Sequence, residues 1–330
     1  MITKLLIILA VIAVIGVAEI LIQFAWMIRQ NKTANNVMLG KTRFEEAEHQ
    51  DTAVVHSVYS EEEISADPGK STVKLYYFPR LNEQKNRYVV ICPGGAYAVC
   101  ALKTEGFPSA AQLNELGYTA FVLEYRTGKN GGGFAAMDDL AAALRYIKAH
   151  AETFHVSADD YALLGFSAGG NLAGLFGTEQ YGWARYEGIH KPSILFLCYP
   201  WCNLNIQSTL PVRSFMYILL NAIGHRFLIG KHATAEEKKR MRIPWQVTDS
   251  FPPCYIIHGT KDIFVPAKTH SEQLASALEK NGVKYHYEKA EGLTHCYGIG
   301  DGTTAEGWLA RAVTFWESES SDRQTHGTML

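Results

Sequence analysis

The sequence has almost no excess of charge, few cysteines and no internal repeat. Its 31 Lys and Arg residues are nearly balanced by 33 Asp and Glu residues, which leaves a formal net charge of −2. Without a basic excess, no overall electrostatic attraction draws the chain to nucleic acid, so we predict no nucleic-acid partner. A content of 47% hydrophobic and 19% charged residues excludes a disordered or low-complexity chain. At 330 residues, the chain is long enough for one large α/β domain or two small ones.

The six cysteines have neither the spacing of a zinc site nor the pattern of a disulfide framework. Cys92, Cys198 and Cys254 lie in apolar runs, where a free thiol behaves as a small hydrophobic side chain. This distribution favours a reducing compartment without deciding it. We predict no metal ion and no cofactor.

One long apolar segment opens the chain. An uncharged run extends from Leu5 to Ala18, and a second apolar run follows Glu19 and ends at Ile28. As one helix, this segment would be about 36 Å long, enough to cross the ~30 Å hydrocarbon core of a bilayer. Residues 1–30 are therefore interpreted as a single-pass membrane anchor or as a signal peptide.

Two observations favour the anchor. Cleavage after Ala18 would leave an apolar N-terminus exposed, and Trp26 followed by Arg29 is typical of the interfacial end of a span. Glu19 counts against the anchor, because a carboxylate in the bilayer costs roughly 2.5 kcal/mol or more. We predict an anchored protein, with secretion after signal cleavage as the alternative. The flanking charges leave the side of the membrane open.

Polar residues 31–50 are typical of a linker and include Asn31-Lys-Thr33, which matches a glycosylation acceptor. Strand-like and helical patterns then alternate over residues 51–318. Most strand candidates are continuously apolar, as in a parallel sheet covered on both faces. The first two should be antiparallel, because only a short turn region separates them. The candidates are 54–59, 73–78, 88–92, 120–123, 161–164, 194–198, 254–257 and 284–287.

The strongest helical patterns are Met137 to Phe154 and Ala267 to Asn281, the latter ending before a capping glycine, Gly282. Together with the strands they predict a doubly wound α/β domain with a mostly parallel eight-stranded sheet and helices on both faces.

Residues 203–250 break the alternation and are interpreted as a helical cap insertion. Their apolar run from Ser214 to Gly224 either covers an acyl pocket, seats the domain on a membrane, or is an ordinary buried helix. Residues 319–330 are predicted to be a flexible tail.

A reactive serine is indicated by Gly165-Phe-Ser-Ala-Gly169, which directly follows an apolar strand and precedes a helical segment. This G-x-S-x-G pattern at a strand–turn–helix junction exposes a strained serine, here Ser167, as a nucleophile. A serine needs a base, and the base needs a carboxylate that orients it. Asp262 follows one late strand and His295 follows the last, so we predict both as partners of Ser167. The other candidates are weaker. His258, within a strand, is interpreted as structural, and so are His270 and His286. The acids Asp249 and Asp301 do not follow a strand end.

An oxyanion hole is predicted from the loop that follows the third strand. Gly94 and Gly95 lie there and allow close approach of the backbone to a substrate carbonyl. We predict that their N–H groups, together with that of Ala168, stabilise the developing negative charge.

With these motifs, residues 50–318 resemble an α/β-hydrolase of the small esterase and deacetylase group, related to hormone-sensitive-lipase-like and acetyl-xylan-esterase-like enzymes. The resemblance implies cleavage of carboxylic esters, often acetyl esters, without a cofactor. Three departures bear on the substrate: Pro93 where histidine is usual, Ala96 where a third glycine is common, and Thr127–Gly133 in place of an acidic stretch. The matching segments are Pro93–Tyr97, Glu124–Arg126, Gly165–Gly170, His258–Pro266 and Thr294–His295.

We therefore expect a serine esterase for small-molecule, short-chain esters that acts through Ser167, His295 and Asp262 and an acyl-enzyme. Two alternatives stay open. The same three residue types cleave amides, as in serine peptidases of this fold, and a binding protein without activity could keep the fold.

Overall fold

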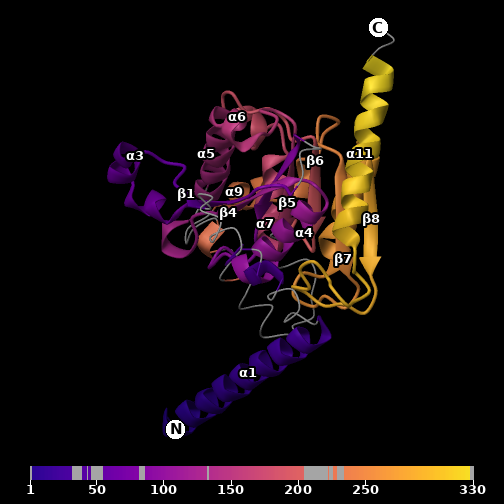
Figure 1. The fold of residues 1–330 in the computed structure, drawn as a ribbon. Helices are drawn as coiled ribbons and strands as arrows, with labels where there is room; N and C mark the ends of the chain where they lie inside the picture. Colours follow the sequence, from indigo (N-terminus) through magenta and orange to yellow (C-terminus); the bar gives the residue numbers. More distant parts are fainter. Residues whose placement is uncertain are drawn as a thin grey trace.

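The computed structural model describes residues 2–31, 39–42, 44–45, 55–81, 86–131, 134–203, 222, 226–228 and 234–327. Within them, eight strands form one sheet in the order β1-β2-β4-β3-β5-β6-β7-β8 (Figure 1). The strands are β1 (Val55–His56), β2 (Lys74–Phe78), β3 (Tyr88–Cys92), β4 (Thr119–Glu124), β5 (Tyr161–Phe166), β6 (Ile194–Cys198), β7 (Cys254–Gly259) and β8 (Tyr285–Ala290).

The pairing of the strands follows the predicted pattern. β1 and β2 are antiparallel, as predicted, and β2 is also antiparallel to β4. The connection between β1 and β2 is not a short turn, however, because it contains a helix, α3 (Glu61–Ala66), and the 3-10 turn Pro68–Thr72. All other neighbours are parallel. The carboxyl ends of β3, β5, β7 and β8 therefore meet at one edge of the sheet, where ligands bind in open α/β sheets.

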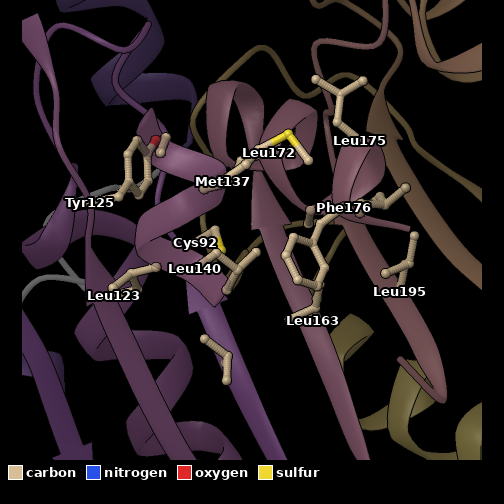
Figure 2. Close-up of a cluster of buried hydrophobic side chains, with 14 of the residues drawn as sticks. Cys92, Leu123, Tyr125, Met137, Leu140, Leu163, Leu172, Leu175, Phe176 and Leu195 are labelled. Carbon is tan, nitrogen blue, oxygen red and sulfur yellow. The ribbon is translucent and has the colours of Figure 1, made fainter. Parts of the chain in front are cut away.

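Helices cover both faces of the sheet, which explains why the central strands are apolar throughout. α5 (Ala135–Ala149), α7 (Ser167–Phe176) and α10 (Ser271–Lys280) pack on one face. α4 (Phe107–Glu115) and α11 (Trp308–Gly327) pack on the other. Figure 2 shows the first of these layers, with Cys92, Leu163 and Leu195 of the sheet beneath side chains of α5 and α7. The predicted doubly wound architecture is confirmed.

The predicted helix Met137–Phe154 is in fact two helices, α5 and the short α6 (Ala151–Phe154), which meet at His150. The imidazole Nδ1 of His150 lies 2.8 Å from the Tyr146 carbonyl oxygen, so the side chain competes with the backbone for a helical acceptor. The predicted end of the later helix at Gly282 is confirmed, because α10 ends at Lys280 and Gly282 has a φ of 68°.

The two predicted segments at the ends of the domain have secondary structure or contacts in their described parts. The linker is not a free tether in its described part, because Phe44 stacks on Phe107 with ring centroids 4.7 Å apart. The predicted tail is helical as far as Gly327, because no glycine or proline follows Gly307 to end α11 earlier. In the cap insertion, a short helix, α9 (Ala235–Arg240), is described, whereas the run Ser214–Gly224 lies outside the described residues apart from residue 222.

The N-terminal segment forms one helix, α1 (Ile2–Gln30), that extends away from the domain (Figure 1). Its part from Ala13 to Gln30 is long and apolar enough to cross a membrane. Large apolar side chains along it are exposed, for example Val14 at 68% and Ile22 at 68%. Near its C-terminal end, in contrast, Met27 is buried in the same core layer as α5 and α7.

Candidate active site

The candidate nucleophile lies at a sharp turn between β5 and α7. Ser167 has a φ of 49°, a left-handed conformation that is costly for a residue with a side chain. The turn is possible because two glycines flank it at close range. A methyl group on Gly165 would lie 2.4 Å from the Gly169 carbonyl oxygen, and one on Gly169 would lie 1.9 Å from that of Cys92. The two glycines therefore permit the strained turn, because no side chain would fit at either position.

The structure brings together the three residues that the sequence predicts for catalysis. His295 Nε2 lies 2.8 Å from Ser167 Oγ, and His295 Nδ1 lies 2.6 Å from Asp262 Oδ2. A carboxylate only accepts hydrogen bonds, so Nδ1 carries a proton. In the neutral imidazole, Nε2 is then an acceptor facing the serine hydroxyl, which is the tautomer a general base needs.

Asp262 is held by four hydrogen bonds, two to each oxygen. Oδ1 accepts from the backbone N–H groups of Phe264 and Val265, each at 2.9 Å. Oδ2 accepts from His295 and from His258 Nε2, at 3.1 Å. The carboxylate is therefore fully satisfied although it is buried.

His258 contributes more to the site than its interpretation as a structural histidine suggests. Its Nε2 also lies 2.7 Å from the Val265 carbonyl oxygen, which can only accept, so this nitrogen carries a proton. Its Nδ1 lies 2.7 Å from Ser271 Oγ. His258 is thus completely buried and held so that it donates to the carboxylate that orients His295. Its position within β7, four residues before Asp262, was the only signal in the sequence.

The charges of Asp262 and His295 stabilise one another. Burial by itself would raise the pKa of Asp262, but His295 and the hydrogen bond from His258 outweigh it and hold the pKa below its usual range. Burial would likewise lower the pKa of His295, yet the negative charge of Asp262 raises it well above its usual value. Asp262 therefore strengthens His295 as a proton acceptor.

Among the described residues, the other acids and histidines form no hydrogen bond with this group. Asp249 and Asp301 are exposed, and so is His286 on β8. His270 is buried beside the backbone N–H of Asn203, and burial is the main reason that its pKa falls to about 3. These positions agree with the sequence interpretation.

The loop after β3 differs from the predicted oxyanion hole at one residue. The Gly94 N–H donates to the carboxylate of Glu105, with N and Oε2 2.6 Å apart, so it is not available to a substrate oxygen. The N–H groups of Gly95 and Ala168 have no hydrogen-bond partner within the described residues, and neither has that of Ala96 between Gly95 and Tyr97. Ala168 lies in the first turn of α7, where backbone N–H groups have no intrahelical acceptor.

Comparison with known proteins places the chain in a family. Residues 89–299, more than half of the chain, match the model of a family with the alpha/beta hydrolase fold. Endo-1,4-beta-xylanase B of Butyrivibrio fibrisolvens is 26% identical over 71% of this chain and 36% of the relative. Acetylxylan esterase of Xylanibacter ruminicola is 27% identical over 66% of this chain and 42% of the relative. Esterase LipC of Mycobacterium tuberculosis is 25% identical over 69% of this chain and 57% of the relative. The chain thus spans between 36% and 57% of the length of these curated relatives.

Solved structures share the fold at lower identity. An acetyl ester-xyloside bifunctional hydrolase from Caldicellulosiruptor lactoaceticus has a TM-score of 0.68 and 23% identity, covering 80% of this chain and 95% of that chain. An esterase from Thermogutta terrifontis has a TM-score of 0.61 and 22% identity, covering 80% and 93%. The family match spans the loop after β3, the serine turn and the loops that carry Asp262 and His295. The chain therefore belongs to the α/β-hydrolase family, as its sequence predicted.

Proposed function

We propose that this protein is a serine hydrolase that cleaves carboxylic esters. The observation that carries the proposal is the hydrogen-bonded series from Ser167 through His295 to Asp262, with distances of 2.8 and 2.6 Å and the imidazole in the tautomer of a general base. Two of the relatives are named as esterases, which supports an ester rather than an amide as the substrate.

The reaction follows from this geometry. Ser167 Oγ attacks the ester carbonyl carbon while its proton passes to His295 Nε2. The N–H groups of Gly95 and Ala168 stabilise the tetrahedral oxyanion, with Ala96 as a further candidate donor. His295 then gives its proton to the departing alkoxide, which leaves an acyl group on Ser167. A water molecule loses a proton to Nε2, attacks the acyl carbon and releases the acid, and the proton returns to Ser167 Oγ.

We expect the acyl group to be short, of the acetyl type. The names of the acetylxylan esterase and of the acetyl ester-xyloside hydrolase support this preference.

The function is tested with the full chain and p-nitrophenyl acetate, butyrate and octanoate. We expect turnover that declines with acyl length and is absent in Ser167→Ala. A fluorophosphonate should label the wild-type protein and not the variant. A folded protein that hydrolyses none of these esters, or a variant that keeps full turnover, would refute the proposal. Faster cleavage of the matching p-nitroanilide would favour the amidase alternative.

We further propose that α1 anchors the enzyme in a membrane as a single-pass helix. Its exposed apolar side chains and its length support this role. After lysis of the producing cells, the full chain should stay with the membranes through an alkaline carbonate wash and be released by detergent. Recovery of a soluble protein that begins at Glu19, after the cleavage site considered at Ala18, would instead establish a cleaved signal peptide.

A further inference from the structure

Glu105 is a buried carboxylate close to the site that the proposed mechanism does not use. It lies in the helical turn Leu102–Gly106 before α4 and is 1% exposed. Its Oε2 accepts from the Gly94 N–H at 2.6 Å, and its Oε1 accepts from the Tyr199 hydroxyl at 2.9 Å. A carboxylate buried at this depth is costly unless such partners satisfy it, so the two contacts hold each other in place.

The two contacts connect Glu105 to both sides of the candidate active site. On one side, a methyl group on Gly94 would lie 2.9 Å from Glu105 Oε2 and 2.9 Å from Ser167 Cβ, so the bonded amide lies directly beside the serine. Fixing this amide fixes the start of the turn that contains Gly95, with a φ of 125°, and Ala96, with a φ of 54°. These residues carry the candidate oxyanion donors.

On the other side, Tyr199 links Glu105 to the base. Tyr199 follows β6, and its ring packs against the imidazole of His295 with centroids 4.7 Å apart. The Tyr199 hydroxyl donates to Glu105 and accepts from the N–H of Gly298, in the loop that carries His295. The carboxylate of Glu105 thus connects the loop of Gly94 with the loop that carries His295 and Gly298.

We propose that Glu105 is a positioning residue that keeps the oxyanion donors and His295 in register with Ser167. This role rests on the proposed function and gives a reason for a carboxyl group at a buried position. Burial raises the pKa of Glu105, while the Gly94 N–H and the charge of His295 partly oppose that effect. A displacement of about 1 Å in such a loop costs up to ~100-fold in rate.

The test compares Glu105→Gln with Asp139→Asn in the full chain. Asp139 is a matched control, because it is also buried and accepts from a backbone N–H, that of Arg126 at 2.7 Å, and from a tyrosine hydroxyl, that of Tyr59 at 2.7 Å. Asp139 has no contact with Ser167, His295 or Asp262 among the described residues.

For Glu105→Gln we expect kcat on p-nitrophenyl acetate to fall between about 10-fold and 100-fold, with KM within about twofold. The affinity for a boronic acid, which mimics the tetrahedral intermediate, should fall by the same factor. Asp139→Asn should lower the thermal midpoint and leave kcat and boronate affinity within about twofold at a temperature where it is folded. An active wild-type enzyme whose Glu105→Gln variant keeps kcat and boronate affinity would refute this inference alone. A wild-type protein without esterase activity or fluorophosphonate labelling would refute the proposed function instead.

A second and independent observation concerns the last residue of the N-terminal segment. Asn31, which directly follows α1, is completely buried. Its Nδ2 donates to the carbonyl oxygen of His295 at 2.5 Å, and its Oδ1 accepts from the hydroxyl of Thr294 at 3.1 Å. A carbonyl oxygen only accepts, so the orientation of the amide is fixed. The same Nδ2 is the atom that would carry a glycan in the Asn31-Lys-Thr33 motif, so this packing and glycosylation exclude one another.

Contacts with the loop of His295 come from the C-terminal end of α1 and the residue after it. Gln30 Nε2 donates to the Gly292 carbonyl oxygen at 3.3 Å, so two successive residues bind the loop 292–295. Most of the remaining helix is exposed and extends away from the domain (Figure 1). We infer that the contact between the end of α1 and this loop positions His295. The contact would couple the proposed membrane anchor to catalysis. It would also place the active site at the membrane surface, where α1 enters the bilayer. This inference also rests on the proposed function.

The test measures kcat, KM and the pH profile of Asn31→Ala in the full chain, both in detergent and in phosphatidylcholine vesicles. Gln30→Ala is the comparison variant at the neighbouring position. We expect Asn31→Ala to lower kcat by about 10-fold with KM unchanged, and to move the acid limb of the pH profile, because the imidazole shifts relative to Asp262. Asn31→Asp, which keeps the acceptor for Thr294 and loses the donor, should give the same loss. Gln30→Ala should lower kcat less than Asn31→Ala does, because the Gln30 side chain is exposed and its hydrogen bond reaches Gly292 rather than His295. If wild type is active and Asn31→Ala keeps both kcat and the pH profile, the inference is wrong, whereas inactivity of wild type would refute the proposed function.

Discussion

Replacing Asp262 with asparagine tests the tautomer that the geometry assigns to His295. Asp262 accepts four hydrogen bonds, from two backbone N–H groups and from the two histidines His295 and His258. Asparagine has one acceptor oxygen and one NH₂ group. If its oxygen keeps the backbone N–H groups, the NH₂ group faces Nδ1–H of His295, and two donors cannot share a hydrogen bond. The imidazole then moves its proton to Nε2, where it can no longer accept the proton of Ser167.

We expect Asp262→Asn to lower kcat on p-nitrophenyl acetate by about 10⁴-fold, as a wrong tautomer does in a Ser-His-Asp triad. At 1.36 kcal/mol for each tenfold change, this corresponds to about 5.4 kcal/mol in the activation free energy. The negative charge of Asp262 raises the pKa of His295, so its removal should also move the acid limb of the residual activity to lower pH. Initial rates between pH 4 and 9, with Ser167→Ala as the background, measure both effects. A loss of less than tenfold, or an acid limb that stays in place, would refute the reasoning.

Four further predictions concern the residues around the site. Gly169→Ala should prevent soluble expression, because its methyl group would lie 1.9 Å from the Cys92 carbonyl oxygen; a soluble and active variant would show that the serine turn can relax. Arg126→Ala should lower the free energy of unfolding in urea by about 3–5 kcal/mol, because it leaves the buried Asp139 without its cation, and a loss below 1 kcal/mol would contradict this. Phe44→Ala should cost about 1 kcal/mol in the same assay through the lost stacking on Phe107, and no change would mean that the linker does not pack as described. Because the folded-state pKa of Asp262 is depressed, its contribution to stability should be present above pH ~4 and be lost on acidification, measurable as the thermal midpoint between pH 3 and 7.

The residues that the sequence predicts well are those whose position depends on short-range pattern. Ser167 lies in a turn whose glycines, strand and helix all fall between Tyr161 and Phe176. Asp262 and His295 come from loops far apart in the chain, yet both follow a strand of a parallel sheet, so they had to meet at the same edge. The resemblance to a known family rests on the same local motifs.

The sequence fails where a role depends on a partner that no local pattern specifies. Gly94 was predicted as an oxyanion donor because it lies in the right loop, but its N–H is taken by Glu105, and a Gly–Glu separation of 11 residues carries no recognisable signal. The contact of Glu105 with Tyr199 spans 94 residues, and that of Asn31 with His295 spans 264. A buried polar residue is recognisable as part of a network only once all of its neighbours are known.

The sequence by itself therefore determined the fold, the turn that contains Ser167 and the strand ends at which Asp262 and His295 lie, because period, glycine placement and strand order are properties of short segments. Only the tertiary structure decided which backbone N–H groups beside Ser167 lack a partner among the described residues, that His258 donates to Asp262, and that Phe44 of the linker stacks on Phe107. It alone showed that the end of α1 binds the loop of His295. The physical reason is that hydrogen bonds of buried polar groups are satisfied across the whole molecule, and a chain discloses these pairings only when it is folded.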